Sequence, residues 1–297
     1  RPGVTVEVMA DPTPENLAPV LPYTEAVIVR ATRIDEAFLA MAPELRIVAR
    51  HGVGYDAVDV PALTRRGIPL TVTPDANAVS VAEHAMMLLL SVARRVKDYD
   101  AATRALDWGP REALPTFDLA GRTLLVVGFG RIGARAARLA AAFGMRVLVH
   151  DPYVPGNTVK GAGFTPTKTL AAGLAEADAV TLHCPSNAET RGLVGKEFVV
   201  AMKRGSVLVN TARGTLVDEE ALAAGLRSGQ VAAAGLDVFW EEPLKAANPL
   251  RDLPNVVMTP HSAAATAEGV RRMSLSCADS VIAAFENRLD PDVVINK

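Results

Sequence analysis

A glycine-rich turn between an apolar run and an alanine-rich stretch constrains the fold more than any other feature of this sequence. Residues 123–127 (TLLVV) are an uninterrupted β-branched and aliphatic run, and residues 128–133 (GFGRIG) follow it directly. A buried parallel strand has this continuous apolar character. A Gly-x-Gly-x-x-Gly turn between a strand and a helix is typical of a dinucleotide-binding βαβ unit. The segment therefore predicts a site for a dinucleotide.

Each glycine of this turn has its own expected role. Gly128 permits the tight turn, Gly130 lets the backbone approach a pyrophosphate, and Gly133 lets the helix pack closely on the strand. Arg131 and Ile132 offer backbone N–H groups at the helix N-terminus, which attracts the phosphate charge.

An acidic residue at the end of the next apolar run indicates which dinucleotide binds. Asp151 follows residues 146–150, close to the spacing of about 20 residues that the motif requires. A carboxylate there accepts hydrogen bonds from both hydroxyls of the adenosine ribose and repels a 2′-phosphate. The sequence therefore predicts NAD rather than NADP.

The rest of the chain alternates short apolar runs with alanine-rich amphipathic stretches, which predicts βαβ units and parallel sheets. Expected strands of a first unit lie at residues 4–8, 26–29, 46–49 and 70–73, with helices at 34–40 and 58–66. Expected strands of a second unit lie at residues 123–127, 146–150, 179–183, 206–210, 233–238 and 256–259. Apolar residues at spacings of three and four predict a long helix over residues 78–106 and another after Ala265.

We therefore predict an α/β protein with two doubly wound parallel-sheet domains. A large Rossmann NAD domain, residues 94–265, is expected to be inserted into a smaller flavodoxin-like substrate domain, residues 1–93 plus 266–297. The helix after Ala265 is expected to return to the first unit, which makes the substrate domain discontinuous.

Composition excludes several classes of partner. Lys and Arg number 31 against 33 Asp and Glu, with a formal net charge of -2, so no excess of basic residues exists to neutralise nucleic-acid phosphates. The apolar stretches are much shorter than the ~20 residues that span a bilayer. Cys184 and Cys277 form neither a disulfide framework nor a metal-type spacing, which favours a reducing cytoplasm. No metal is expected.

Three polar segments follow apolar strands of the second unit, at the edge where ligands of such sheets bind. They are residues 210–214 (NTARG), 237–243 (DVFWEEP) and 259–262 (TPHS). Together they supply an arginine, carboxylates and a histidine, the minimal set for oxidising a 2-hydroxy acid beside a nicotinamide. Arg213 is expected to bind the substrate carboxylate in bidentate fashion, and His261 to exchange the hydroxyl proton. The residues alone do not distinguish Glu241 from Glu242 as the partner of the histidine.

In this order, these motifs resemble the D-isomer-specific 2-hydroxyacid dehydrogenases, and most closely the phosphoglycerate dehydrogenase branch. The resemblance covers essentially the whole chain. It is carried by residues 52–56 (GVGYD), 77–84, 128–133, 210–214, Asp237 with Glu242, and Pro260-His261.

The resemblance implies a catalytic set of Arg213 as carboxylate anchor, His261 as acid/base and Glu242 as its charged partner. It also implies that Val53 and Gly54 present backbone N–H groups to the substrate.

Further binding residues follow from the same resemblance. Arg30 and Arg50 match basic positions that face a distal phosphate. Expected cofactor contacts beyond the glycine turn and Asp151 are Cys184, Pro185, Thr211, Ala212 and, near the nicotinamide amide, Asp237. A homodimer is expected, with residues 78–106 and the segment around Trp108 in the interface.

Departures from the family pattern leave the substrate open. Family members usually begin with a further strand and helix before the stretch matching residues 4–8, so we expect an N-terminal truncation. The chain stops at Lys297, so feedback control through a C-terminal regulatory domain is not expected. Trp240 is bulky, and the residues after His261 lack a glycine often found there. Arg30 and Arg50 suit a second anion, as in 3-phosphoglycerate, whereas Trp240 favours a compact or planar group, so 3-phosphoglycerate and related small acids stay open.

The predicted function is NAD-dependent interconversion of a D-2-hydroxy acid and its 2-keto acid. A formate- or phosphite-type dehydrogenase is one alternative, although formate oxidation releases no alkoxide proton and needs no His–Glu pair. A non-catalytic NAD-sensing protein is another. Three other histidines, His84, His150 and His183, are expected to have structural roles, whereas His51 lies where it could touch substrate.

Overall fold

The computed structural model describes residues 3–113 and 115–297, so Arg1, Pro2 and Leu114 of the expected domains lie outside the described residues. The chain forms two compact units. The first comprises Arg1–Asn77 and Ala267–Lys297, and the second comprises Ala78–Thr266. Both contain parallel sheets with helices, so the α/β class is confirmed.

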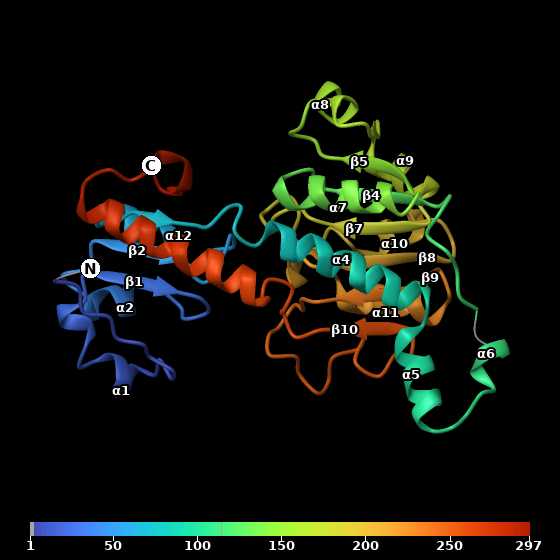
Figure 1. The fold of residues 1–297 in the computed structure, drawn as a ribbon, viewed down its shortest axis with the longest axis horizontal. Helices are drawn as coiled ribbons and strands as arrows, with labels where there is room; N and C mark the ends of the chain where they lie inside the picture. Colours follow the sequence, from blue (N-terminus) through green and yellow to red (C-terminus); the bar gives the residue numbers. More distant parts are fainter. Residues whose placement is uncertain (1–2, 114) are drawn as a thin grey trace. The chain divides into compact units, whose positions relative to one another are not determined.

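The second unit is built on a seven-stranded sheet with the order β10-β9-β8-β7-β4-β5-β6 (Figure 1). Every pairing in it is parallel. The strands are β4 (Thr123–Val127), β5 (Arg146–His150), β6 (Thr165–Pro166), β7 (Ala179–Leu182), β8 (Ser206–Asn210), β9 (Val231–Leu236) and β10 (Val256–Met258). Six of them were expected. The seventh, β6, is a two-residue edge strand that contains a proline, too short to show in the apolar pattern.

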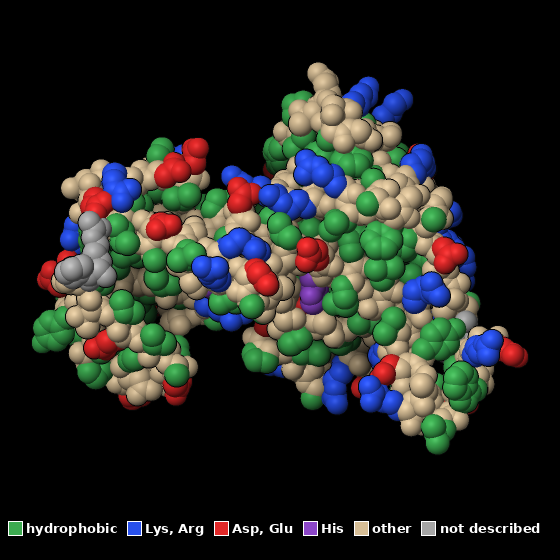
Figure 2. Space-filling model, in the orientation of Figure 1, with side chains coloured by type: hydrophobic (Ala, Val, Ile, Leu, Met, Phe, Trp, Pro, Cys, Tyr) green, Lys and Arg blue, Asp and Glu red, His purple; other side chains and the backbone are tan. Residues whose placement is uncertain are grey.

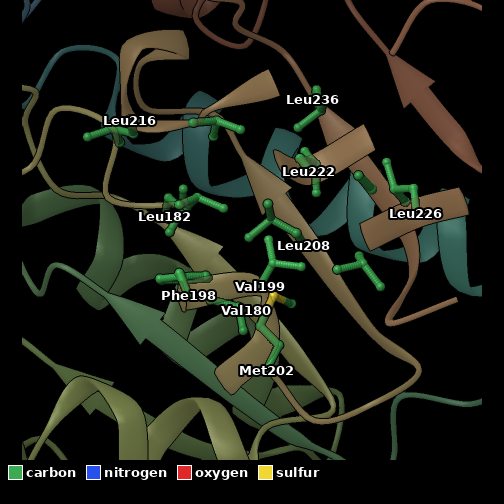
Figure 3. Packing of buried hydrophobic residues seen from close by; sticks show 14 of the residues in the cluster. Val180, Leu182, Phe198, Val199, Met202, Leu208, Leu216, Leu222, Leu226 and Leu236 are labelled. Carbon is green, nitrogen blue, oxygen red and sulfur yellow. The ribbon is translucent and has the colours of Figure 1, made fainter. Parts of the chain in front are cut away.

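Helices cover both faces of this sheet, because successive strand residues point to opposite sides. Leu124 and Val126 of β4 join a core cluster under α4 and α7, whereas Leu125 and Val127 join a second cluster. Figure 3 shows residues of the second cluster, contributed by strands β7–β9 and by helices α10 (Lys196–Ala201) and α11 (Glu219–Arg227). The helices are α4 (Ala78–Ala93), α5 (Val96–Arg104), α6 (Pro110–Ala113), α7 (Arg131–Ala142), α8 (Gly156–Gly161), α9 (Leu170–Glu176), α10 (Lys196–Ala201) and α11 (Glu219–Arg227). This is the doubly wound arrangement that the sequence predicted.

The long helix expected over residues 78–106 is two helices. α4 ends at Ala93, and Arg95 takes a left-handed backbone with φ 50° before α5 begins. The cause is a change of environment, since α4 is largely buried whereas α5 has no buried residue. α4 also packs on α7 and β9. The division between the units therefore falls after Asn77 and Thr266, not at the expected positions 93/94 and 265/266.

The first unit has a three-stranded parallel sheet with the order β1-β2-β3. Its strands are β1 (Ala26–Val29), β2 (Ile47–Arg50) and β3 (Leu70–Thr71), and its helices are α1 (Pro14–Leu17), α2 (Glu36–Met41), α3 (Val60–Arg65) and α12 (Ala267–Phe285). The prediction of a strand at residues 4–8 is wrong. This segment pairs with no strand and leaves Val6 77% and Val8 88% exposed. The expected return of the last helix is confirmed, since α12 packs on β2 and β1.

On the face drawn in Figure 2, basic and acidic side chains are interspersed. Within the described residues, no helix combines the length and the apolar character needed to cross a membrane. The same residues contain no group of three or more His, Cys, Asp and Glu side chains gathered as metal ligands.

Candidate active site

The polar segments singled out in the sequence leave the sheet of the second unit at one edge. All of its strands are parallel, so the loops after β4, β7, β8, β9 and β10 start from the same side. β4 lies between β5 and β7, where the order of the strands along the chain reverses. Ligands of open α/β sheets bind at this reversal point.

The glycine turn after β4 is shaped by two close contacts and one open space. At Gly128, with φ +92°, a Cβ would lie 2.6 Å from the backbone nitrogen of Cys184. At Gly133 a Cβ would lie 2.0 Å from the carbonyl oxygen of Gly128. A Cβ at Gly130 would meet no atom within 4 Å. Gly128 and Gly133 thus serve the packing of the protein itself, whereas Gly130 leaves room above the turn for a ligand.

Asp151 is fixed beside this turn. Its Oδ2 accepts a hydrogen bond of 2.7 Å from the backbone N–H of Phe129, and its Oδ1 accepts one of 2.9 Å from the backbone N–H of Tyr153. At the end of β8, the hydroxyl of Thr211 is buried and has no hydrogen-bond partner. An open turn, a fixed carboxylate and an unpartnered hydroxyl at one edge fit a dinucleotide with a diol-bearing ribose.

Cys184 lies against the glycine turn. Burial raises the pKa of its thiol to about 11, so the side chain stays protonated at neutral pH, and the thiolate is the reactive form. Its contact with Gly128 instead places the backbone after β7 beside the expected cofactor site.

The structure brings His261 and Glu242 together. Nδ1 of His261 lies 2.6 Å from Oε2 of Glu242, and because a carboxylate only accepts, the imidazole donates. The other oxygen, Oε1, accepts from the N–H of Phe239 at 3.0 Å. Burial raises the pKa of Glu242, but the hydrogen bonds from His261 and Phe239 outweigh it and bring the pKa below its usual range. Glu241, the other carboxylate that the sequence left open, pairs with Lys245 instead.

Arg213 stands on the neighbouring loop. The side-chain amide of Asn210 donates to the carbonyl of Arg213 at 2.8 Å and accepts from the N–H of Ala212 at 2.9 Å, which fixes the turn after β8. A Cβ on Gly214 would lie 1.8 Å from the carbonyl of Phe239, so the loop of Arg213 touches the loop of Glu242. The arginine, the glutamate and the histidine therefore come from three adjacent strand ends.

Asp237, expected near the nicotinamide amide, is fully buried at 0% exposure. Its carboxylate accepts from the N–H groups of Ser262 and Ala263 at 2.9 Å each. It thus holds the loop that carries His261, whose backbone is left-handed at φ 50°. Sequence reasoning missed this use of the carboxylate, because nothing in the spacing shows which backbone amides a buried aspartate will meet.

The remaining expected substrate residues belong to the first unit. Arg30 directly follows β1, Arg50 ends β2, and Val53 and Gly54 lie in the loop after β2. Arg50 donates to the carbonyl of His51. Burial lowers the pKa of His51, and the charges of Arg30 and Arg50 lower it further, while the carbonyl of Val270 opposes them.

The three histidines expected to have structural roles are hydrogen-bonded to threonines. His84 contacts Thr259 at 2.9 Å, His150 contacts Thr167 at 3.2 Å and His183 contacts Thr181 at 3.0 Å. Burial lowers the pKa of His183 to about 4, so that imidazole is neutral.

The chain is similar to known proteins. Residues 86–263 match the family described as "D-isomer specific 2-hydroxyacid dehydrogenase, NAD binding domain". The chain belongs to this family. The match confirms the resemblance inferred from the motifs, and the matched residues fall within the second unit.

Proteins similar to this chain are named for several different activities. A D-3-phosphoglycerate dehydrogenase of Mycobacterium leprae is 44% identical over 98% of this chain, which spans only 55% of that protein. A glyoxylate reductase of Korarchaeum cryptofilum is 42% identical over 88% of this chain and 79% of its own. The solved D-lactate dehydrogenase of Aquifex aeolicus, complexed with NAD and lactic acid, superposes with a TM-score of 0.86 at 30% identity, covering 97% of this chain and 90% of its own.

Proposed function

We propose that this chain interconverts a D-2-hydroxy acid and its 2-keto acid with NAD. The observation that carries the proposal is the 2.6 Å hydrogen bond between Nδ1 of His261 and Glu242. This bond places the proton of the neutral imidazole on Nδ1, so Nε2 has a lone pair for the substrate hydroxyl. Bound NAD would supply the hydride acceptor for C2 in oxidation, and its reduced form would supply the hydride donor in reduction.

In oxidation, Nε2 of His261 takes the hydroxyl proton as the C2–H bond breaks, and the imidazolium that forms is stabilised by the carboxylate of Glu242. In reduction the imidazolium gives this proton back to the forming hydroxyl. The guanidinium of Arg213 binds the substrate carboxylate, and its fork geometry suits a bidentate contact. The reacting carbon is thereby positioned between a carboxylate anchor and a proton acceptor that come from neighbouring loops.

The proposal assigns cofactor contacts to the edge described above. They are Gly128, Gly130, Arg131, Ile132, Gly133, Asp151, Cys184, Pro185, Thr211 and Ala212. For Asp237 the contacts with residues 262 and 263 favour a role in holding the catalytic loop over a contact with the nicotinamide amide.

Residues of the first unit complete the proposal. The backbone amides of Val53 and Gly54 are assigned to the substrate carboxylate, and Arg30 and Arg50 to a second anionic group on the substrate. Their support is the family resemblance and the basic surroundings of His51. Two anionic groups favour 3-phosphoglycerate or a related small acid.

The glycine turn gives a matched pair of tests. We expect Gly130→Ala to weaken NAD binding about tenfold or more with an unchanged melting temperature, since its Cβ enters open space that the proposal gives to the pyrophosphate. Gly133→Ala should instead lower the stability by about 1–3 kcal/mol, because its Cβ overlaps the carbonyl of Gly128. Gly161→Ala, also in open space but on α8, is the control. Calorimetry with NAD and thermal melting measure both effects. Equal NAD affinity in Gly130→Ala and the control would contradict the assignment.

The proposed activity is tested by following NADH consumption with phosphohydroxypyruvate, hydroxypyruvate, glyoxylate and pyruvate. We expect NADH oxidation with at least one of them, and a product of D configuration from any substrate other than glyoxylate, whose product is achiral. Parallel assays of NAD reduction with formate and with phosphite address the first alternative. NADH binding without turnover in any assay would favour the NAD-sensing alternative and overturn the proposal.

We also propose a homodimer in a reducing cytoplasm. The segment containing α5 and α6 has no buried residue in its helices and exposes Leu106 at 84% and Trp108 at 69%. Apolar side chains of this size are typical of interface residues. Cys184 and Cys277 are unpaired thiols, which suits a reducing compartment. Light scattering of the purified chain measures the oligomeric state.

A further inference from the structure

A buried polar network lies behind the catalytic histidine. The carboxylate of Asp237 accepts on Oδ1 from the hydroxyl of Thr259 at 2.5 Å and from the N–H of Ser262, and on Oδ2 from the N–H of Ala263. The main chain of Asp237 takes part as well, since its carbonyl accepts from the N–H of His261 at 2.7 Å. Asp237 therefore holds the chain both before His261, at Thr259, and after it, at Ser262 and Ala263.

This anchoring matters because His261 has an unfavourable backbone. Its φ of 50° lies in the left-handed region, which residues with a side chain rarely adopt. Such a conformation persists only where surrounding contacts enforce it, and it is common at functional sites. We expect that, without the hydrogen bonds that Asp237 accepts, the loop would relax and move the imidazole away from Glu242.

The network has one member from a distant part of the chain, His84 on α4. Its Nε2 lies 2.9 Å from the hydroxyl of Thr259 and 3.4 Å from Oδ1 of Asp237. A carboxylate only accepts, so Thr259 gives its single proton to Asp237. The hydroxyl oxygen is then left to accept from His84, which places a proton on Nε2 of that imidazole.

α4 holds His84 at a fixed distance from this loop. The helix packs on β9 and β10, the strands that precede Asp237 and His261 (Figure 1). The packing is close, because a Cβ on Gly235 of β9 would lie 2.8 Å from the Cβ of Leu88. A donor on such a helix has little freedom to move away from Thr259.

We propose that His84 is a positioning residue for His261, acting through Thr259 and Asp237. It holds the hydroxyl of Thr259 in the orientation that donates to the buried carboxylate, and the carboxylate in turn holds the catalytic loop. The effect of His84 on turnover rests on the proposed function, whereas its effect on the loop does not.

Three substitutions separate this role from simple packing. His84→Gln puts an amide nitrogen near the place of Nε2, His84→Asn puts one near the place of Nδ1, and His84→Leu keeps bulk without a donor. His150→Leu is the matched control, since His150 also bonds a threonine but lies at the end of β5. The four variants and the parent chain are compared by hydrogen exchange over residues 259–263, by NAD affinity, by kcat and KM, and by thermal melting.

We expect His84→Leu and His84→Asn to speed exchange of the Ser262 and Ala263 amides and to lower kcat about 3- to 10-fold, as loss of a hydrogen bond to a neutral hydroxyl does. NAD affinity and KM for the cofactor should change less than about twofold. His84→Gln should restore slow exchange and most of kcat, and the control should match the parent chain.

Exchange at Ser262 and Ala263 that is unchanged in His84→Leu would overturn the inference. So would His84→Gln and His84→Leu losing the same activity. If His84→Leu does not fold, comparing exchange and kcat between His84→Asn and His84→Gln still tests the inference, because both side chains are amides of similar polarity. If the parent chain turns over no substrate, the proposed function fails while the exchange comparison still tests the role of His84.

Discussion

Replacing His261 by alanine should reduce kcat by about 10²- to 10⁴-fold, the usual contribution of a positioned general acid or base. NAD should still bind with nearly unchanged affinity, because the glycine turn and Asp151 follow β4 and β5, several strands away from β10, which precedes His261. Stopped-flow kinetics in both directions and calorimetry with NAD measure the two quantities. Unchanged kcat in this variant would contradict the assignment of His261.

Glu242→Gln is the companion of this variant. Glutamine keeps a hydrogen-bond acceptor beside Nδ1 of His261 but removes the charge that stabilises the imidazolium. We therefore expect a smaller loss of kcat than in His261→Ala, with unchanged NAD affinity. Glu241→Gln is the control, since Glu241 pairs with Lys245. A larger loss in Glu241→Gln than in Glu242→Gln would reverse the choice between the two carboxylates.

Arg213→Met should lower kcat/KM for the 2-keto acid by about 10²- to 10³-fold, within the 2–5 kcal/mol typical of removing one partner of a buried charge pair. Arg213→Lys should recover only part of it, because an ammonium group does not make the bidentate contact. Arg146→Met is the control, since Arg146 begins β5 at the opposite edge and pairs with Glu176. Equal kcat/KM for Arg213→Met and Arg146→Met would contradict the assignment of Arg213 to the substrate carboxylate.

Much of the fold follows from the sequence because buried parallel strands carry a continuous apolar signal. Residues 123–127, 146–150 and 206–210 are strands with the expected bounds. The segment 4–8 has the alternation of a strand but no neighbour to pair with, and pairing is not visible in a single segment. The end of α4 was missed for a similar reason, since burial stops at Ala93 while helix-forming residues continue.

For the candidate site, the sequence predicts only which loops lie at the same edge of the sheet. Parallel strands bring their ends to one edge, so the sequence predicts that Arg213 and His261 share this edge. A sequence contains no distances, and the choice of Glu242 over Glu241 depends on the family resemblance. The role of His84 was not visible at all, because Thr259 is 175 residues away along the chain.

The central claim is that the guanidinium of Arg213 and the His261–Glu242 pair act on one substrate. A crystal structure of the chain with NADH and the unreactive keto-acid analogue oxamate tests it most directly. The account predicts the oxamate carboxylate on Arg213 and its carbonyl oxygen about 3 Å from Nε2 of His261, with Nδ1 still bound to Glu242. An analogue bound out of reach of His261, or a His261 side chain detached from Glu242, would contradict it.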